Sequence, residues 1–218
     1  MLFDVDGVVV ESELLHMLTF NELLEPLEIN ITEAEWKTRF LGAGSASVMQ
    51  TLFDEHDITE DPKSWIIRRR ELYQEHVKQG DLQPVPGFLE FYQSVKKADL
   101  QLAFVSTGHP TNLAAALGSL GLMGKHPVID ATQVTRLKPD PEAYILGAQT
   151  LKVRPDHCLV FEDSPIGVTA AKTAEMLCVG LTTTNPETDL NHADLIINSF
   201  QGWTIHSILD AVGASMLC

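Results

Sequence analysis

The sequence predicts an α/β protein in which helices cover both faces of a parallel β-sheet and a helical domain is inserted near the start of the chain. After Gly87, short apolar runs alternate with helical segments, which is typical of a doubly wound sheet. One further apolar run, Leu2-Phe3, stands at the beginning. Between these two parts, from about Glu11 to Gly80, only helical patterns occur.

The N-terminal part predicts a strand, a loop and a block of helices. Leu2-Phe3 stops at Asp4 and is followed by Gly7, as expected of a strand that feeds a loop. Pro62 suits a first helical turn and Gly80 suits a helix end. The expected helices of this block are Glu11 to Leu24, Glu33 to Leu41, Ala46 to His56 and Pro62 to Gln79.

The part after Pro84-Val85-Pro86-Gly87 supplies the rest of the sheet and its helices. The expected strands are Leu102 to Val105, Val128 to Asp130, Cys158 to Phe161, Leu177 to Leu181 and Leu195 to Ile197. The expected helices are Phe88 to Lys97, Thr111 to Leu120, Pro141 to Leu151, Pro165 to Glu175 and Trp203 to Val212. We therefore expect a sheet domain over residues 1–11 and 84–218 and a helical domain over residues 12–83.

The composition narrows the range of partners. Hydrophobic residues make up 44% of the chain and charged residues 21%, as in an ordinary globular protein. Fifteen lysines and arginines stand against 30 acidic residues, so the formal net charge is -15. Because such a charge repels nucleic-acid phosphates and anionic lipids, we expect neither a nucleic acid nor a membrane as partner. The sequence carries no signal for an oligomeric state.

The N-terminus and the cysteines predict a cytoplasmic location. The chain begins with two carboxylates, Asp4 and Asp6, and shows neither a basic leader nor a long apolar segment. No run approaches the roughly 20 apolar residues of a membrane helix. The cysteines form no C-x-x-C pair, and we expect reduced, buried thiols rather than a disulfide or zinc site. These cysteines are Cys158, Cys178 and Cys218.

Polar residues follow three of the predicted strands, and a lysine follows a fourth at a distance. In doubly wound sheets, ligands bind at the carboxyl ends of the strands. Each residue alone has an ordinary explanation as a turn, cap or surface residue. Their joint occurrence predicts a functional site. The segments are Asp4-Val5-Asp6-Gly7, Ser106-Thr107-Gly108, Glu162-Asp163-Ser164 and Lys138.

These residue types suit phosphoryl chemistry. Residues i and i+2 of an extended segment point to the same side, so Asp4 and Asp6 can face one reacting centre. Clustered carboxylates repel one another unless a hard cation such as Mg2+ relieves the repulsion. Lys138 and the Ser106 hydroxyl offer donors to a phosphoryl group.

Four segments, in order, resemble a known family. FDVDGVVVESELLH, AFVSTG, RLKPDPEAY and VFEDSPIGVTAAKTA are similar to the first to fourth motifs of the haloacid dehalogenase superfamily. The resemblance covers nearly the whole chain and implies a Rossmann-like core. The helical block resembles the cap domain of the branch that contains beta-phosphoglucomutase and small sugar-phosphate phosphatases.

The resemblance implies a role for each site residue. Asp4 would form an aspartyl-phosphate, and Asp6 would protonate the leaving oxygen and then activate water. Mg2+ would be bound by the Asp4 side chain, the Asp6 carbonyl and a carboxylate of the fourth motif, with Asp163 preferred and Glu162 as the alternative. The residues implied to hold the phosphate or substrate are Ser106, Lys138, Gly7 and Thr107.

The helical block also carries candidate substrate-binding residues. His16 matches the start of the family's cap, and Arg68, Arg69 and Arg70 lie near the position of a basic cap residue. Spacing does not show which of these arginines would bind substrate. That all three lie on a solvated helix face without a functional role is an equally good interpretation. Arg39 is the nearest basic residue to the turn where related mutases carry an arginine.

We therefore predict a Mg2+-dependent phosphatase that acts on a small phosphorylated metabolite, with sugar phosphates as the expected class. Dehalogenases and phosphonate hydrolases of the superfamily generally lack the second aspartate, so Asp6 favours phosphate esters. A phosphosugar mutase is the alternative. A non-catalytic binding protein on the same fold ranks below both, because all the motif residues are present.

Overall fold

A computed structural model describes residues 1–213 and divides the chain into two compact units. Unit 1 consists of Met1–Glu11 and of the chain from Gln83 onward, and unit 2 is Ser12–Leu82. In unit 1 the backbone N–H of Glu11 donates to the carbonyl oxygen of Gln83 at 2.9 Å. The chain therefore leaves and re-enters unit 1 at two residues that are bonded to each other.

Unit 1 is built on a six-stranded parallel sheet with the order β3-β2-β1-β4-β5-β6, which confirms the predicted doubly wound fold. Leu2 of β1 pairs with Ala103 on one side and with Val160 on the other. Because β1 is central and the chain turns to opposite sides from it, its carboxyl end lies at the switch point of the sheet. The strands are β1 (Leu2–Phe3), β2 (Ala103–Val105), β3 (Val128–Ile129), β4 (Leu159–Glu162), β5 (Leu177–Leu181) and β6 (Leu195–Ile197).

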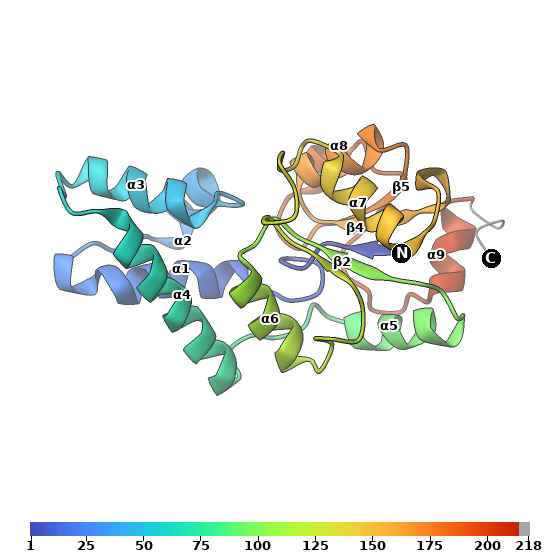
Figure 1. Cartoon of the computed structure of the whole chain (residues 1–218), viewed down its shortest axis with the longest axis horizontal. Helices are drawn as coiled ribbons and strands as arrows, with labels where there is room; N and C mark the ends of the chain where they lie inside the picture. Colours follow the sequence, from blue (N-terminus) through green and yellow to red (C-terminus); the bar gives the residue numbers. More distant parts are fainter. Residues whose placement is uncertain (214–218) are drawn as a thin grey trace. The chain divides into compact units, whose positions relative to one another are not determined.

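Helices cover both faces of this sheet (Figure 1). The pair α7 and α8 packs on one face, and α5 and α9 lie together on the other. The helices of unit 1 are α5 (Phe88–Lys97), α6 (Pro110–Ser119), α7 (Glu142–Leu151), α8 (Pro165–Thr173) and α9 (Ile205–Ala211), with 3-10 turns at Pro155–His157 and Glu187–Leu190.

The two residues of β1 show how the core is divided. Leu2 points into the cluster beneath α7 and α8, which also contains Val160 and Tyr144. Phe3 points the other way, as alternation along a strand requires. Its ring stacks on Phe161 with centroids 4.6 Å apart, and Phe88 meets it edge-on at 5.9 Å. This short strand is thus anchored on both faces, and it fixes the position of the residue that follows it.

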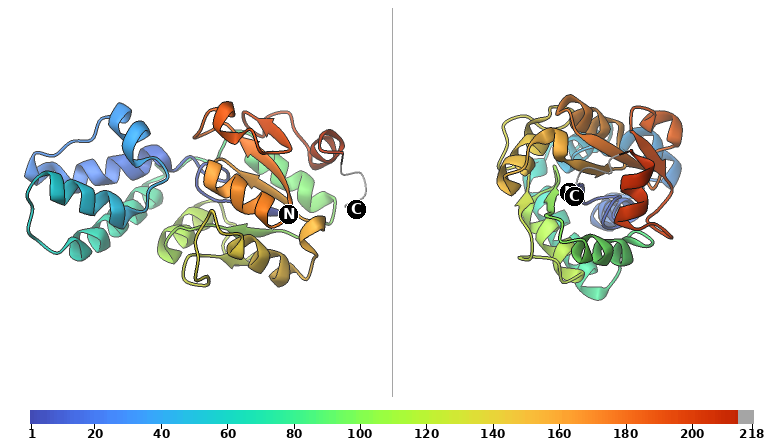
Figure 2. Two further views of the ribbon diagram at one scale, coloured as in Figure 1. Left: turned by 90° about the horizontal axis from the view of Figure 1, so that it is seen from above. Right: turned by 90° about the vertical axis from the view of Figure 1, so that its right-hand side faces the viewer.

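Unit 2 is helical, as the sequence predicts. In Figures 1 and 2, α4 runs along both α1 and α3. Pro62 occupies the first turn of α4, and Gly80 ends it with φ of 93°. The helix expected over Glu33 to Leu41 begins as an α-helix and continues as a π-helical turn. The elements are α1 (Glu13–Leu24), a 3-10 turn (Glu25–Leu27), α2 (Glu33–Glu35), the π-turn (Trp36–Phe40), α3 (Ser45–Glu55) and α4 (Pro62–Gln79).

Two further predictions concern membranes and cysteines. Within residues 1–213, no helix combines the length and the apolar character that a bilayer crossing needs. Cys158 and Cys178 are buried free thiols. Cys218, the third cysteine, lies outside the described residues.

Candidate active site

Asp4 lies directly after the central strand. Its backbone N–H donates to the Phe161 carbonyl oxygen at 3.0 Å, so the ladder between β1 and β4 holds the first site residue. The side chain belongs to the few buried charged groups of unit 1, because Asp4 is only 7% exposed. A buried carboxylate at this position needs a positive partner.

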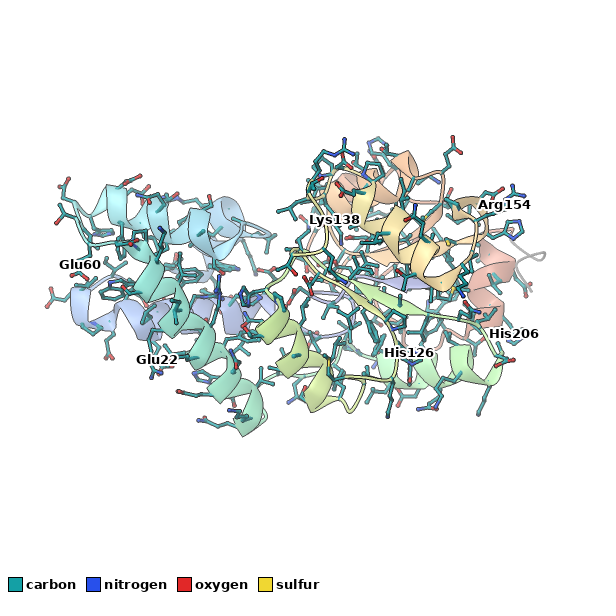
Figure 3. All side chains as sticks on the ribbon, viewed as in Figure 1. Glu22, Glu60, His126, Lys138, Arg154 and His206 are labelled. Carbon is teal, nitrogen blue, oxygen red and sulfur yellow. The ribbon has the colours of Figure 1, made fainter. Side chains whose placement is uncertain are left out.

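Lys138 is that partner. It lies on the segment that leads into α7 (Figure 3), and its Nζ forms ion pairs with Asp4 Oδ1 and, at 2.6 Å, with Glu162 Oε1. A third, longer contact of 3.4 Å joins Nζ to the Val105 carbonyl oxygen. Burial alone would lower the pKa of Lys138, but the two carboxylates outweigh it and raise that pKa above its usual range. The site therefore contains a fixed positive charge.

Burial has the opposite effect on Asp4. Burial raises the pKa of Asp4 to about 7. The positive charge of Lys138 lowers this pKa, whereas the negative charges of Glu162 and Asp6 raise it. Three carboxylates around one ammonium leave an excess of negative charge. A cation or a proton at Asp4 would relieve it.

Glu162 is fully buried, and both of its carboxylate oxygens are occupied. Oε1 accepts from Lys138 and, at 2.6 Å, from the Tyr144 hydroxyl. Oε2 accepts from the backbone N–H groups of Asp163 and Ser164 at 3.1 and 3.2 Å and from the Ser164 hydroxyl at 3.0 Å. Glycine at 167 makes room for this carboxylate, since a Cβ there would overlap it. Through these contacts Glu162 holds both Lys138 and the start of α8.

Asp163 points toward the loop after β1. Gly7 has a φ of 71°, and a Cβ at this residue would overlap the carboxylate of Asp163 and approach the Thr184 hydroxyl at 2.5 Å. Both the backbone conformation and the space therefore require glycine here. The Asp163 carboxylate and the Gly7 backbone are in direct contact, which joins the ends of β1 and β4.

Asp6 and Ser106 meet at Gly108. A Cβ on Gly108 would lie 3.5 Å from Asp6 Oδ2 and 3.2 Å from Ser106 Oγ, so both polar groups border the same glycine. Ser106 Oγ accepts from the Gly108 N–H at 3.0 Å, which leaves its hydrogen available to a ligand. Thr107, also predicted as a substrate-binding residue, is exposed.

The loop after β5 contributes two residues that the sequence analysis missed. The Thr183 hydroxyl donates to the Gly7 carbonyl oxygen at 2.5 Å, and the Asn185 amide donates to the Asp163 carbonyl oxygen at 2.9 Å. The sequence did contain an indication of these site residues, because three threonines and an asparagine directly follow an apolar strand. Tyr144 was also missed, and it gave no such signal because it lies inside a helix.

The candidate residues of unit 2 fall into two groups. Arg68 and Arg39 are exposed and are paired with acidic neighbours, Arg68 with Glu71 at 3.0 Å and Arg39 with Glu55. Arg70 is half-buried. Arg68 also pairs with Glu75 at 3.2 Å, so the acidic partners of Arg68 and Arg39 lie on the surface of unit 2.

Arg69, in contrast, is only 1% exposed. Its guanidinium lies 4.3 Å from the Phe20 ring centroid and contacts the Ser45 hydroxyl and, at 2.7 Å, His16 Nδ1. His16 in turn stacks on Tyr73 with centroids 4.8 Å apart. The structure thus distinguishes Arg69 from its neighbours and connects it with the predicted His16.

The fold and site together define a class of enzyme, in which a buried carboxylate and a fixed ammonium lie at the switch point of a doubly wound sheet. The chain belongs to the haloacid dehalogenase-like hydrolase family, whose sequence profile it matches over residues 1–181. The family resemblance of the four motifs is thereby confirmed.

Individual relatives act on phosphorylated metabolites. Validoxylamine A 7'-phosphate phosphatase of Streptomyces hygroscopicus subsp. limoneus is 39% identical over 114 residues, which is 52% of this chain and 54% of the relative. Beta-phosphoglucomutase of Bacillus subtilis is 24% identical over 94% of this chain and 91% of its own. The crystal structure of CbbY from Rhodobacter sphaeroides in complex with phosphate superposes with a TM-score of 0.82, at 27% identity, over 94% of this chain and 96% of that one.

Proposed function

We propose that this protein is a Mg2+-dependent phosphatase that hydrolyses a small phosphorylated metabolite, with sugar phosphates as the preferred class, through a phosphoaspartate on Asp4. The observation that carries the proposal is the pairing of buried Asp4, at the end of the central strand, with the fixed ammonium of Lys138. The relatives named for phosphorylated substrates support the substrate class.

The donor groups at the site fit Mg2+. Asp4 and Asp163 supply carboxylate oxygens from neighbouring strand ends, and the Asp6 carbonyl would complete an oxygen-only set of the kind that Mg2+ prefers. Among residues 1–213, no three His, Cys, Asp or Glu side chains are grouped so that side chains alone would hold a metal ion. When bound, Mg2+ would neutralise part of the charge of the phosphoryl group.

The residues divide the reaction into two steps. An Asp4 carboxylate oxygen attacks phosphorus and the ester P–O bond breaks, while Asp6 donates a proton to the leaving oxygen. Asp6, now a carboxylate, takes a proton from water, whose oxygen attacks the phosphoaspartate and releases phosphate and free Asp4. Lys138 and the Ser106 hydroxyl would hold the phosphoryl oxygens throughout.

We propose residues 12–83 as a cap that selects the substrate, and hydrolysis as the main activity. A mutase must bind a second phosphate, yet the segment from Gly42 to Ser47 holds no basic residue of its own. The Arg69 guanidinium, which contacts the Ser45 hydroxyl, is also engaged with His16 and the Phe20 ring. Arg39, which precedes this segment, is engaged with Glu55. These features favour hydrolysis over return of the phosphoryl group to the sugar. A cytoplasmic location stays a prediction from the sequence.

The test is phosphate release from p-nitrophenyl phosphate and from a panel of phosphometabolites, ranked by kcat/KM. We expect turnover with Mg2+, none after chelation, inhibition by Ca2+, and none in Asp4→Asn with the fold retained. Full activity after chelation, or turnover by Asp4→Asn, would contradict the mechanism. Supplying beta-glucose 1-phosphate with a trace of the 1,6-bisphosphate separates the alternatives, because isomer formation faster than phosphate release would identify a mutase.

A further inference from the structure

We propose that Tyr144 is a positioning residue that holds Lys138 against Asp4, an inference that rests on the proposed function of this site. Tyr144 is linked to Lys138 indirectly through Glu162 and directly through its ring. Its hydroxyl donates to Glu162 Oε1 at 2.6 Å, and the same oxygen accepts from Lys138 Nζ at 2.6 Å. Its ring faces the ammonium, with Nζ 4.8 Å from the ring centroid.

A lysine needs such support to be held in one place. Its side chain rotates about four bonds and loses much entropy when it is fixed. Nζ has three hydrogens, and its contacts are Asp4, Glu162 and, weakly, the Val105 carbonyl oxygen. The Tyr144 ring lies near the same ammonium, where a cation–π contact favours the charged form. The ammonium is therefore surrounded by groups that determine its position.

Tyr144 is itself rigid. It is completely buried, and α7, which carries it, packs on β1, β2 and β3. The helix thereby links the sheet, whose strand ends carry Asp4 and Ser106, to the ammonium. The hydroxyl matters separately from the ring, because a phenylalanine could fill the same apolar space without orienting the Glu162 carboxylate.

The alternative is that Tyr144 is only a core residue with a satisfied hydroxyl. Tyr92 provides a matched comparison in the same unit. It is 3% exposed, and its hydroxyl bonds to Nε2 of His126, a residue labelled in Figure 3, at 2.8 Å. Tyr92→Phe and Tyr144→Phe each remove one hydrogen-bonded hydroxyl from a buried tyrosine, but only the second hydroxyl contacts the partner of Lys138.

The first measurement is steady-state kinetics with saturating Mg2+, below the unfolding temperature of each variant. For Tyr144→Phe we expect kcat to fall about tenfold, as the loss of one charge-assisted hydrogen bond permits, with a smaller change in KM. For Tyr92→Phe we expect both constants within about twofold of the wild type, since loss of a single neutral hydrogen bond far from the site affects only stability. A fall in kcat of similar size in both variants would overturn the proposal.

The second measurement does not depend on catalysis. The ammonium of Lys138 is observed by 1H–15N NMR and assigned through contacts with the ring at position 144, which both tyrosine and phenylalanine provide. We expect its protons to exchange with water several-fold faster in Tyr144→Phe and unchanged in Tyr92→Phe.

The two measurements separate this inference from the proposed function. If the wild type hydrolyses no phosphate ester, the proposed function fails, and the exchange rate alone decides whether Tyr144 positions Lys138. An unchanged exchange rate in Tyr144→Phe would overturn the positioning role, whatever happens to kcat.

Discussion

The hydroxyl of Thr183 donates a 2.5 Å hydrogen bond to the carbonyl oxygen of Gly7. This bond connects the loop after β5 with the loop after β1, where Asp4 and Asp6 lie. Asn185 makes a parallel connection to the Asp163 carbonyl oxygen. The β5 loop therefore holds both backbone segments that would carry the metal ligands.

Removing the first of these bonds should weaken metal binding. In Thr183→Val we expect the Mg2+ concentration for half-maximal binding to rise about tenfold, a typical effect of losing a group that orients a metal ligand. Isothermal calorimetry with Mg2+ measures this without turnover. Thr182→Val is the matched control, because its hydroxyl bonds to Asn198 Oδ1 at 3.1 Å instead. Equal affinities in the two variants would show that the Gly7 contact plays no part.

Asp4 should make the metal-free protein less stable as the pH rises. Its pKa in the folded state is about 7, mainly through burial, against 3.8 as the ordinary value. Between these values the folded state binds more protons than the unfolded state, so the free energy of unfolding falls with increasing pH, by up to about 1.4 kcal/mol per unit. The stabilising effect of the proton is complete below pH 3.8 and is lost through pH 7.

Denaturant unfolding in the presence of a chelator, compared between wild type and Asp4→Asn, isolates this contribution. The asparagine variant should lack this part of the pH dependence. The same slope in both proteins between pH 4 and 7 would assign it to other groups.

Asp6→Ala should slow the two chemical steps unequally. With an activated leaving group such as p-nitrophenol, formation of the phosphoaspartate needs little proton donation, whereas its hydrolysis still needs a base. We expect hydrolysis to slow on the order of a hundredfold or more, and formation much less. Rapid-quench measurement of the phosphoenzyme follows both steps. Equal slowing of the two would remove Asp6 from the acid–base role.

His76 should stabilise unit 2 at low pH. Its ring nitrogens contact Glu22 at 2.8 Å and Asp81 at 2.6 Å, and these hydrogen bonds raise the pKa of His76. Because the folded-state pKa is above the unfolded value of 6.5, the stabilisation is complete below pH 6.5 and is lost as the pH rises through the folded value. Because Glu22 and Asp81 are exposed and screened by solvent, pairs of this kind contribute about 0.2–1 kcal/mol.

Thermal unfolding of His76→Gln across pH 5 to 9 checks this prediction. We expect a lower Tm than in the wild type at pH 5, and a difference that shrinks at high pH. His56→Gln, at an exposed position of the same unit, serves as control. A difference between wild type and His76→Gln that is constant across the pH range would contradict the prediction.

Local patterns were sufficient to predict the elements of the fold. The apolar runs Leu177 to Leu181 and Leu195 to Ile197 coincide with β5 and β6, and each run ends where a polar residue, Thr182 or Asn198, follows it. The order of the strands was not predicted, since pairing depends on contacts between residues far apart in the sequence. The π-helical turn at Trp36–Phe40 was also missed, because a helical pattern does not reveal a change in hydrogen-bond spacing.

The sequence predicted which strand ends carry the site residues, but not how each side chain is used. Glu162 and Asp163 are consecutive, and residues at the end of a strand alternate in direction, so one had to face inward. The sequence does not say which, and in the structure it is Glu162 that accepts from Tyr144 and Lys138. For the arginines a signal was available, because Ile66, Arg69 and Tyr73 have the spacing of one helix face. The spacing alone could therefore have predicted that Arg69 lies on the buried face of this helix.

The hydrogen bond between Glu11 and Gln83 has a consequence for the evolution of the protein. The two residues at the insertion point are bonded to each other within unit 1, so the inserted segment begins and ends at the same place in the fold. Domains whose ends lie together tolerate insertion and exchange. A different segment could be substituted there with little disturbance to the sheet. On the proposed role of unit 2 as the substrate-selecting cap, exchange of this one segment would change the substrate and leave the residues at the strand ends as they are.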